Sequence, residues 1–220
     1  MRLAAQPAPI IEGDPVSETE TEQALFWKGD FGDQYISRNQ SPEFLASNVH
    51  FFAKILASAG SEIGSVLELG SNIGMNYLAL RQLIPKLSYS AVEINPTAVK
   101  ELRALGVDVF PSSIEDFEAD SCWDLVFTKT VLIHLHPEYL DATYEKMTRM
   151  ASRFVLVAEY FNPVAVSVDY RGEEERLFKR DFAGEILDRF PSMRLKDYGF
   201  SYNRGPFPQD NISWFLLEKS

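Results

Sequence analysis

An acidic residue followed closely by two spaced glycines marks the segment of the chain with the most chemical content. Glu68 lies in a short apolar run, Gly70 and Gly74 bound the next loop, and a helical pattern begins at Met75. Strand, glycine loop and helix in this order build nucleotide pockets in α/β proteins, because glycine lets the backbone approach a ligand closely. Asn72 stands in place of the middle glycine of the dinucleotide-binding pattern G-x-G-x-x-G. A pyrophosphate needs an unobstructed backbone at that position, so the asparagine favours a nucleoside ligand without phosphates. Glu68 is interpreted either as part of this pocket or as a structural acid that ties down the loop.

A second acid, Glu93, ends the next apolar run. A carboxylate has two acceptor oxygens, which suits the two adjacent hydroxyls of a ribose. The alternative is a solvated acid that precedes the helix start at Asn95 and Pro96. We favour the ribose interpretation.

These residues must be positioned by alternating strands and helices. The pattern predicts strands over residues 66–69, 87–94, 107–110, 122–127 and 153–160, with helices over 75–84, 95–105 and 137–150. Alternation of this kind predicts right-handed crossovers and a parallel sheet of the α/β class. After residue 161 we predict a charged helix over 173–190, then strands over 193–200 and 212–218 joined as an antiparallel hairpin.

The N-terminal part of the chain divides into a tail and a cover. Residues 1–20 lack periodicity and are predicted to be a flexible tail. Residues 21–60 are predicted to form a helical lid or cover, which includes an amphipathic helix of about 16 residues that starts at Ser41. Trp27, Phe31 and Tyr35 recur at helical spacing, either as a buried helix face or as an aromatic lid. Residues 61–220 then form the main domain.

Composition limits the class of partner. The chain has 220 residues, 45% of them hydrophobic, and a net charge of −11, which argues against binding to a nucleic acid backbone. The single cysteine, Cys122, fits a reducing compartment. We find neither a signal-peptide core nor a run approaching the ~18 apolar residues of a membrane span. We therefore expect a cytoplasmic protein with a small-molecule or protein partner, and we assign no metal ligands.

Four segments together resemble class I S-adenosylmethionine-dependent methyltransferases: VLELGSNIGMN, AVEIN, PSSIEDF and WDLVFTKTVLIHL. The resemblance implies a three-layer αβα Rossmann-like fold whose seven-stranded sheet has parallel strands and a C-terminal antiparallel hairpin. It implies S-adenosylmethionine as cofactor and S-adenosylhomocysteine as product. The flanking segments FWKGDFGDQYISRN, RGEEERLFKRDFAGEILD and FPQDNISWFLLEK resemble methylases associated with pseudaminic acid biosynthesis.

The resemblance also implies roles for individual residues at the cofactor. The glycine loop would border the methionine part, with Glu68 organising it, while Glu93 would hold the ribose. Ile94 would pack on the adenine, and Thr128 would face the methionine and the methyl group. The full set of cofactor-binding candidates is Glu68, Gly70, Ser71, Asn72, Gly74, Glu93, Ile94, Ser113, Ile114 and Thr128.

Catalysis and acceptor binding need residues outside this shared core. A hydroxyl acceptor profits from a general base, and our candidates are His134, Tyr35 and Lys129; His134 could equally be a packing residue. An anionic or sugar-like acceptor would suit aromatic and arginine-rich ends of the chain. The candidates for its binding are Trp27, Phe31, Arg38, Asn39, Tyr170, Arg171, Tyr202 and Arg204.

The function expected is methyl transfer to an O or N atom of a sugar-like or secondary-metabolite acceptor. Two alternatives remain open from the sequence. One is an NAD-dependent oxidoreductase, against which Asn72 and the final hairpin argue. The other is a domain that binds the cofactor or a partner without turnover. The oligomeric state is left undetermined.

Overall fold

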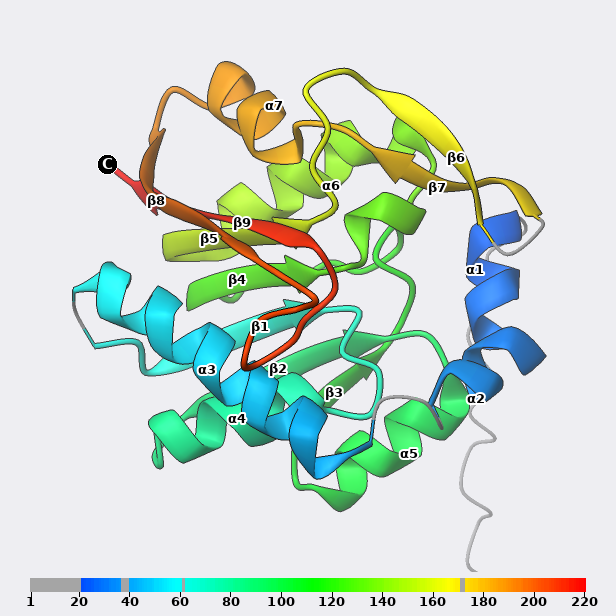
Figure 1. Cartoon of the computed structure of the whole chain (residues 1–220), viewed down its shortest axis with the longest axis horizontal. Coiled ribbons are helices and arrows are strands. Elements are labelled where there is room, and N and C mark those ends of the chain that lie inside the picture. The colour runs from blue at the N-terminus through cyan, green and yellow to red at the C-terminus, as the bar shows by residue number, and fades with distance from the viewer. Residues whose placement is uncertain (1–20, 37–39, 61, 171–172) are drawn as a thin grey trace, which may run out of the picture.

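A seven-stranded sheet forms the centre of the protein, which we describe from a computed structural model covering residues 21–36, 40–60, 62–170 and 173–220 (Figure 1). The strand order is β3-β2-β1-β4-β5-β9-β8. All neighbours from β3 to β5 pair in parallel, whereas β9 pairs antiparallel with both β5 and β8. The bounds are β1 Ser65–Leu69, β2 Ser88–Glu93, β3 Asp108–Pro111, β4 Trp123–Lys129, β5 Ala151–Glu159, β8 Met193–Ser201 and β9 Ile212–Lys219. The predicted fold class is confirmed.

Helices cover both faces of the sheet, as Figure 1 shows. On one face lie α3 (Pro42–Ala59), α4 (Met75–Leu83) and α5 (Pro96–Ala104), and on the other lie α6 (Pro137–Met150) and α7 (Phe182–Arg189). Each face has its own apolar core, because the strands carry buried residues on both sides. None of the helices within the described ranges combines the length and the apolar character that crossing a membrane requires.

Helix starts follow the signals in the sequence. The Ser41 hydroxyl accepts a hydrogen bond from the Phe44 amide at 3.1 Å, and the Asn95 side chain accepts one from the Ala98 amide at 3.0 Å. A proline follows each cap, where its missing N–H costs nothing. The second cap matters for function because it fixes Asn95 at the carboxyl end of β2.

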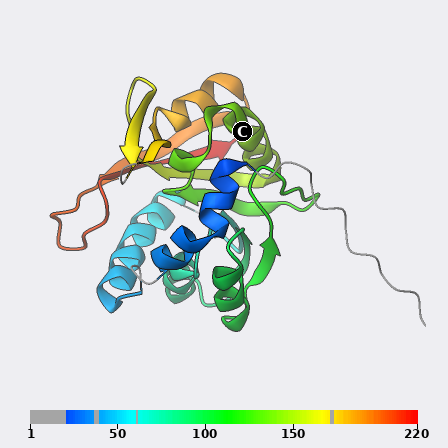
Figure 2. The ribbon, with the colours of Figure 1, turned by 90° about the vertical axis from the view of Figure 1, so that its right-hand side faces the viewer.

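Two short helices, α1 (Glu22–Lys28) and α2 (Asp30–Ile36), lie across the edge of the sheet where the parallel strands end. Figure 2 looks at this edge and shows both helices in front of it. The chain breaks between them at Gly29, whose extended backbone ends α1. The predicted boundaries between tail, cover and main domain stay predictions, and residues 1–20 lie outside the described ranges.

The predicted helix over residues 173–190 is wrong in its first half. Residues Glu173–Lys179 form strand β7, which pairs antiparallel with β6 (Val166–Tyr170), and the helix α7 starts only after Asp181. Leu177 and Phe178 are both buried. Consecutive side chains of a strand point to opposite faces, so the β6–β7 ribbon buries one of these residues on each face. Burial of both side chains outweighs the helical propensity of the charged residues that precede them.

Candidate active site

A cavity of about 170 Å³ lies at the carboxyl ends of β1, β2 and β4, under α1 and α2. This is the switch point of the sheet, because β1 is flanked by β2 on one side and β4 on the other. The structure brings together ten of the predicted site residues in its walls: Trp27, Gly70, Ser71, Asn72, Glu93, Ile94, Ser113, Ile114, Lys129 and His134.

Other predicted residues lie elsewhere. Glu68, Gly74 and Thr128 are buried but do not line the cavity. Phe31 stacks on Phe26 with ring centroids 4.1 Å apart. Tyr202 and Arg204 are exposed on the loop between β8 and β9 and do not reach the cavity. Arg38, Asn39 and Arg171, and the side chains of Tyr35 and Tyr170, lie outside the described residues.

The glycine loop has the conformation that its residues permit. Gly70 has a φ of 78°, and a Cβ there would come within 2.8 Å of the Val131 side chain. Asn72 also has a positive φ, 48°, which asparagine tolerates better than most residues. Its side-chain oxygen accepts a hydrogen bond from the Ile73 amide at 2.7 Å. Asparagine therefore replaces the middle glycine without losing the turn.

Glu93 holds the loop and the start of α5 together. Its carboxylate accepts hydrogen bonds from the Asn72 amide at 2.6 Å and from the Asn95 amide at 2.8 Å, one on each oxygen. Burial raises the pKa of Glu93, and these amides oppose that shift. A carboxylate oxygen can accept more than one hydrogen bond, so each retains a site for a ligand hydroxyl.

Asn76 is a site residue that the sequence analysis missed. It lines the cavity from the first turn of α4, and its amide nitrogen donates to the Glu68 carboxylate at 2.6 Å. Tyr89 donates to the other Glu68 oxygen. The Asn76 side-chain oxygen is buried and has no hydrogen-bond partner among the described residues. A buried acceptor of this kind fits a ligand that brings a donor, such as an ammonium group.

A strained turn follows β4. Thr130 has a φ of 57°, which is unusual for a β-branched residue. Its amide donates to the Ala158 carbonyl at 2.9 Å, while the amides of Val131 and Leu132 donate to Glu159 at 3.0–3.1 Å. These bonds hold the strained backbone, which carries Lys129 before it and His134 after it.

Glu159 was also missed, although it resembles Glu68 in being an acid within an apolar strand. It is almost fully buried at the end of β5. Burial raises its pKa to about 7, and the Val131 and Leu132 amides oppose the shift. Glu159 therefore supports the site from behind, because its carboxylate orients the turn after β4.

Lys129 brings a buried cation to the cavity wall. Its side chain is 92% buried, and its Nζ lies 5.4 Å from the Phe44 ring centroid and 5.6 Å from that of Phe51. Burial lowers its pKa to about 8, and the charges of Glu68, Asp210 and Glu159 oppose the shift.

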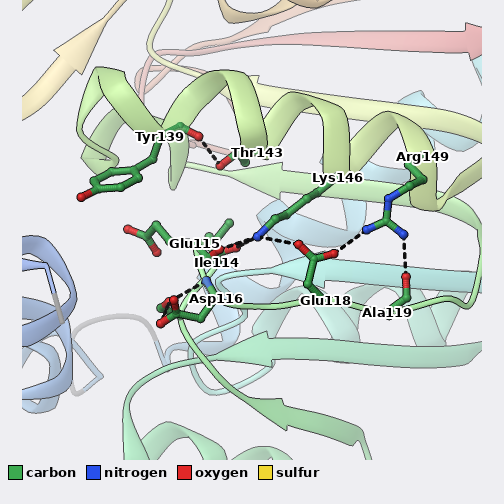
Figure 3. Close-up of polar contacts among 10 residues, drawn as sticks. Ile114, Glu115, Asp116, Glu118, Ala119, Tyr139, Thr143, Lys146 and Arg149 are labelled. Carbon is green, nitrogen blue, oxygen red and sulfur yellow. Dashed lines mark hydrogen bonds and ion pairs between the residues drawn. The ribbon is translucent and has the colours of Figure 1, made fainter. Parts of the chain in front are cut away.

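The loop after β3 forms the far wall and is fixed by α6, as Figure 3 shows. Lys146 donates to the carbonyls of Ile114 and Glu115, and it pairs with Glu118 at 3.2 Å. Arg149 binds Glu118 from the other side at 2.6 Å. The loop thereby holds the apolar Ile114 side chain at the cavity wall, where it could pack against a purine.

The helices α1 and α2 close the cavity through Asn95. The side-chain nitrogen of Asn95, Nδ2, donates to the Trp27 carbonyl at 3.2 Å and to the Asp33 carboxylate at 3.1 Å. Trp27 in turn packs on His134, with ring centroids 4.8 Å apart. Helices α1 and α2, which are called the cover from here on, are thus tied both to α5 and to the turn after β4.

Comparison with known proteins gives a structural but no sequence match. Neither protein-family models nor curated protein sequences match the chain. Among solved structures, the plantazolicin methyltransferase BpumL in complex with S-adenosylhomocysteine has a TM-score of 0.63 at 14% identity, with 90% of this chain and 94% of that chain covered. Magnesium protoporphyrin IX methyltransferase from Synechocystis PCC 6803 with bound S-adenosylmethionine has a TM-score of 0.64 at 13% identity, with 93% and 100% covered.

A third similar structure is the glycopeptide N-methyltransferase MtfA, with a TM-score of 0.61 at 11% identity and 82% and 99% covered. The fold is therefore that of S-adenosylmethionine-dependent methyltransferases. The three similar enzymes have different acceptors by name, so the fold leaves the acceptor open.

Proposed function

We propose that the protein is a cytoplasmic methyltransferase that transfers a methyl group from S-adenosylmethionine to an O or N atom of a small-molecule acceptor. The observation that carries the proposal is the paired arrangement of Glu93 and Asn76 in one cavity. Glu93 offers acceptor sites for ribose hydroxyls. The Asn76 side-chain oxygen, which lacks a hydrogen-bond partner in the described part of the chain, offers one for the cofactor's ammonium group.

The residues of the cavity would hold the cofactor in a defined order. Glu93 would bind the ribose, and Ile94 and Ile114 would provide apolar faces for the adenine. Gly70 would let the methionine part approach the backbone, next to Asn76. The bound cofactor supplies a methyl group already activated as a sulfonium. The protein therefore contributes mainly positioning and exclusion of water, and the cover of α1 and α2 is suited to both.

We assign the role of general base to His134. It lines the cavity after the strained turn, and its ring is held by Trp27. An imidazole titrates near neutral pH, so it can take the proton of an acceptor hydroxyl as the methyl group is transferred, or the proton of an acceptor ammonium before the transfer, which needs the neutral amine. Tyr35 remains a candidate from the sequence alone.

For the acceptor we propose an anionic or sugar-like molecule, as the resemblance to methylases associated with pseudaminic acid biosynthesis suggests. Among the predicted acceptor residues that the structure describes, Trp27 lines the cavity. Tyr202 and Arg204, which do not reach the cavity, would contribute only if the acceptor extends beyond it.

The proposal is tested by incubating the protein with methyl-labelled S-adenosylmethionine and fractionated cell extract, followed by mass spectrometry of small molecules. We expect one fraction to contain a product heavier by one labelled methyl group. A domain that only binds the cofactor would release no labelled product from any fraction. An NAD-dependent oxidoreductase would bind NAD in place of S-adenosylmethionine, and that result would overturn the cofactor assignment.

A further inference from the structure

Lys129 combines deep burial with a free hydrogen-bonding capacity. Its side chain is 8% exposed, and it lines the cavity. No residue in the described parts of the chain accepts a hydrogen bond from its Nζ or lies within ion-pair distance of it. Its near neighbours are the faces of Phe44 and Phe51, which attract a cation but accept no conventional hydrogen bond.

An unpaired buried ammonium is costly, so such a group either loses its proton or finds an anion. The pKa of Lys129 is lowered to about 8, which leaves most molecules charged at neutral pH. The side chain therefore enters the cavity as a cation with three donors and no acceptor. That state suits binding of an anion better than removal of a proton from an acceptor.

The surroundings limit the charge of that anion. Glu68, Asp210 and Glu159 all act on Lys129 through their negative charge, from beyond ion-pair distance. A doubly charged phosphate would be repelled by this set, and one ammonium could not neutralise it. A single carboxylate matches the charge of one lysine and can accept its hydrogen bonds.

We propose that Lys129 is a carboxylate-binding residue of this cavity. This inference rests on the proposed function for the identity of the ligands. Two ligands could bring the carboxylate: the methionine end of the cofactor, whose ammonium group would then meet Asn76, or an acidic acceptor beside the methyl group. Lys129 in either case fixes one reactant relative to the other and is a positioning residue.

The test uses the full-length protein, its Lys129→Met variant and Lys100→Met as a control that removes an exposed charge from α5. Calorimetry measures the affinity for S-adenosylhomocysteine and for 5′-methylthioadenosine, which lacks the amino acid end. Methionine keeps the unbranched chain and removes only the buried charge. We therefore expect the Lys129→Met variant to unfold at a temperature no lower than the wild type.

If the cofactor supplies the carboxylate, Lys129→Met weakens S-adenosylhomocysteine binding about 10- to 100-fold and leaves 5′-methylthioadenosine binding unchanged. If the acceptor supplies it, both affinities stay the same, and acetate added to the S-adenosylhomocysteine complex shifts the NMR signal of Lys129 Nζ. The Lys129→Met variant identifies that signal in lysine-labelled protein.

The inference is overturned if both affinities are unchanged and acetate shifts the Lys129 signal in neither the free protein nor the complex. Equal weakening of both nucleosides would also overturn it, because the loss would then be structural. If the wild type binds neither nucleoside, the proposed function fails instead. Acetate binding by the free protein would still test Lys129 in that case.

Discussion

Three buried carboxylates organise the candidate site, and each holds donors from a different part of the chain. Glu68 orients Asn76, Glu93 joins the glycine loop to α5, and Glu159 holds the turn after β4. They end, or nearly end, β1, β2 and β5, where side chains from separate strands meet at one edge of the sheet. Burial raises the pKa of each of these carboxyl groups, and hydrogen bonds from the site itself oppose that shift.

Glu93→Ala should weaken S-adenosylhomocysteine binding by at least about tenfold, because it removes the proposed acceptor for the ribose and frees the backbone amides of Asn72 and Asn95. Calorimetry measures this. Asp124→Ala is a matched control, since Asp124 accepts from the amides of Gly64 and Ser65 at 2.8 and 3.0 Å but does not line the cavity. Equal loss of affinity in the two variants would contradict the role of Glu93.

With an identified acceptor, His134→Ala should show a kcat lower by about 100-fold or more, because the proposed base for the acceptor proton is lost. Its rate should also lose the rise with pH that an ionising imidazole gives the wild type. His136→Ala should keep the wild-type profile, since His136 lies outside the cavity and contacts Glu138. An unchanged pH profile for His134→Ala would refute the assignment.

Glu159 should make the protein less stable as pH rises from about 4.5 to 7. Its pKa is about 7 in the folded state and near 4.5 when unfolded, so the folded state binds more protons in this window. The free energy of unfolding contributed by Glu159 falls by about 3 kcal/mol across it.

The Glu159→Gln variant lacks this titration, while its amide oxygen can still accept from the turn. Relative to the wild type, the variant should therefore gain stability with rising pH in urea unfolding experiments. Parallel pH profiles for the two proteins would contradict the raised pKa of Glu159.

At the scale of elements, the cover depends on close contact between α1, α2 and α5. A Cβ on Gly32 would lie 2.0 Å from the Trp27 carbonyl oxygen and 2.8 Å from the side-chain nitrogen of Asn95. Gly32→Ala must therefore push α2 away from α1 and Asn95. We expect faster hydrogen exchange in residues 22–36 and weaker S-adenosylhomocysteine binding, with little change in the melting temperature of the main body.

Gly29→Ala is the matched control for this prediction, because a Cβ there would lie 3.3 Å from the Leu25 carbonyl oxygen and would not come within 4 Å of Asn95. It should leave exchange and binding near wild-type values. If Gly32→Ala binds as the wild type does, the cover does not contribute to the site.

Most elements of the sheet could be predicted because their signals are local. Proline and asparagine at residues 95–96 and serine and proline at 41–42 define helix starts, and alternating strands and helices define the parallel order. The β6–β7 ribbon could not be read in this way. Its charged run favours a helix locally, and only packing of Leu177 and Phe178 on the body decides for a strand.

The residues of the candidate site also differ in whether a local sequence signal reveals them. The position of Gly70 and Glu93 in the cavity wall was predictable, because a glycine and a carboxylate at strand ends are typical of a ligand pocket. Glu159 carried a readable signal, a buried acid in an apolar strand. Asn76 carried no such signal, and Asn95 carried only that of a helix start, because their hydrogen bonds to Glu68, Trp27 and Asp33 join segments that only the fold brings together.

At the scale of the whole molecule, the cavity joins parts of the chain that are far apart in sequence. The cover comes from residues 22–36, other walls come from the loops after β1, β2 and β3, and Lys129 and His134 come from the segment around the end of β4. Ligand binding should therefore stabilise the molecule as a unit, because it links the cover to the sheet.

The most direct test of the central claim is the melting temperature of the protein with S-adenosylhomocysteine and with NAD. At a ligand concentration of about 100 times Kd, S-adenosylhomocysteine should raise the melting temperature by roughly 5–10 °C. NAD should leave it unchanged, because the Asn72 loop lacks the middle glycine of a pyrophosphate site. A shift with NAD alone, or no shift with S-adenosylhomocysteine, would contradict the account.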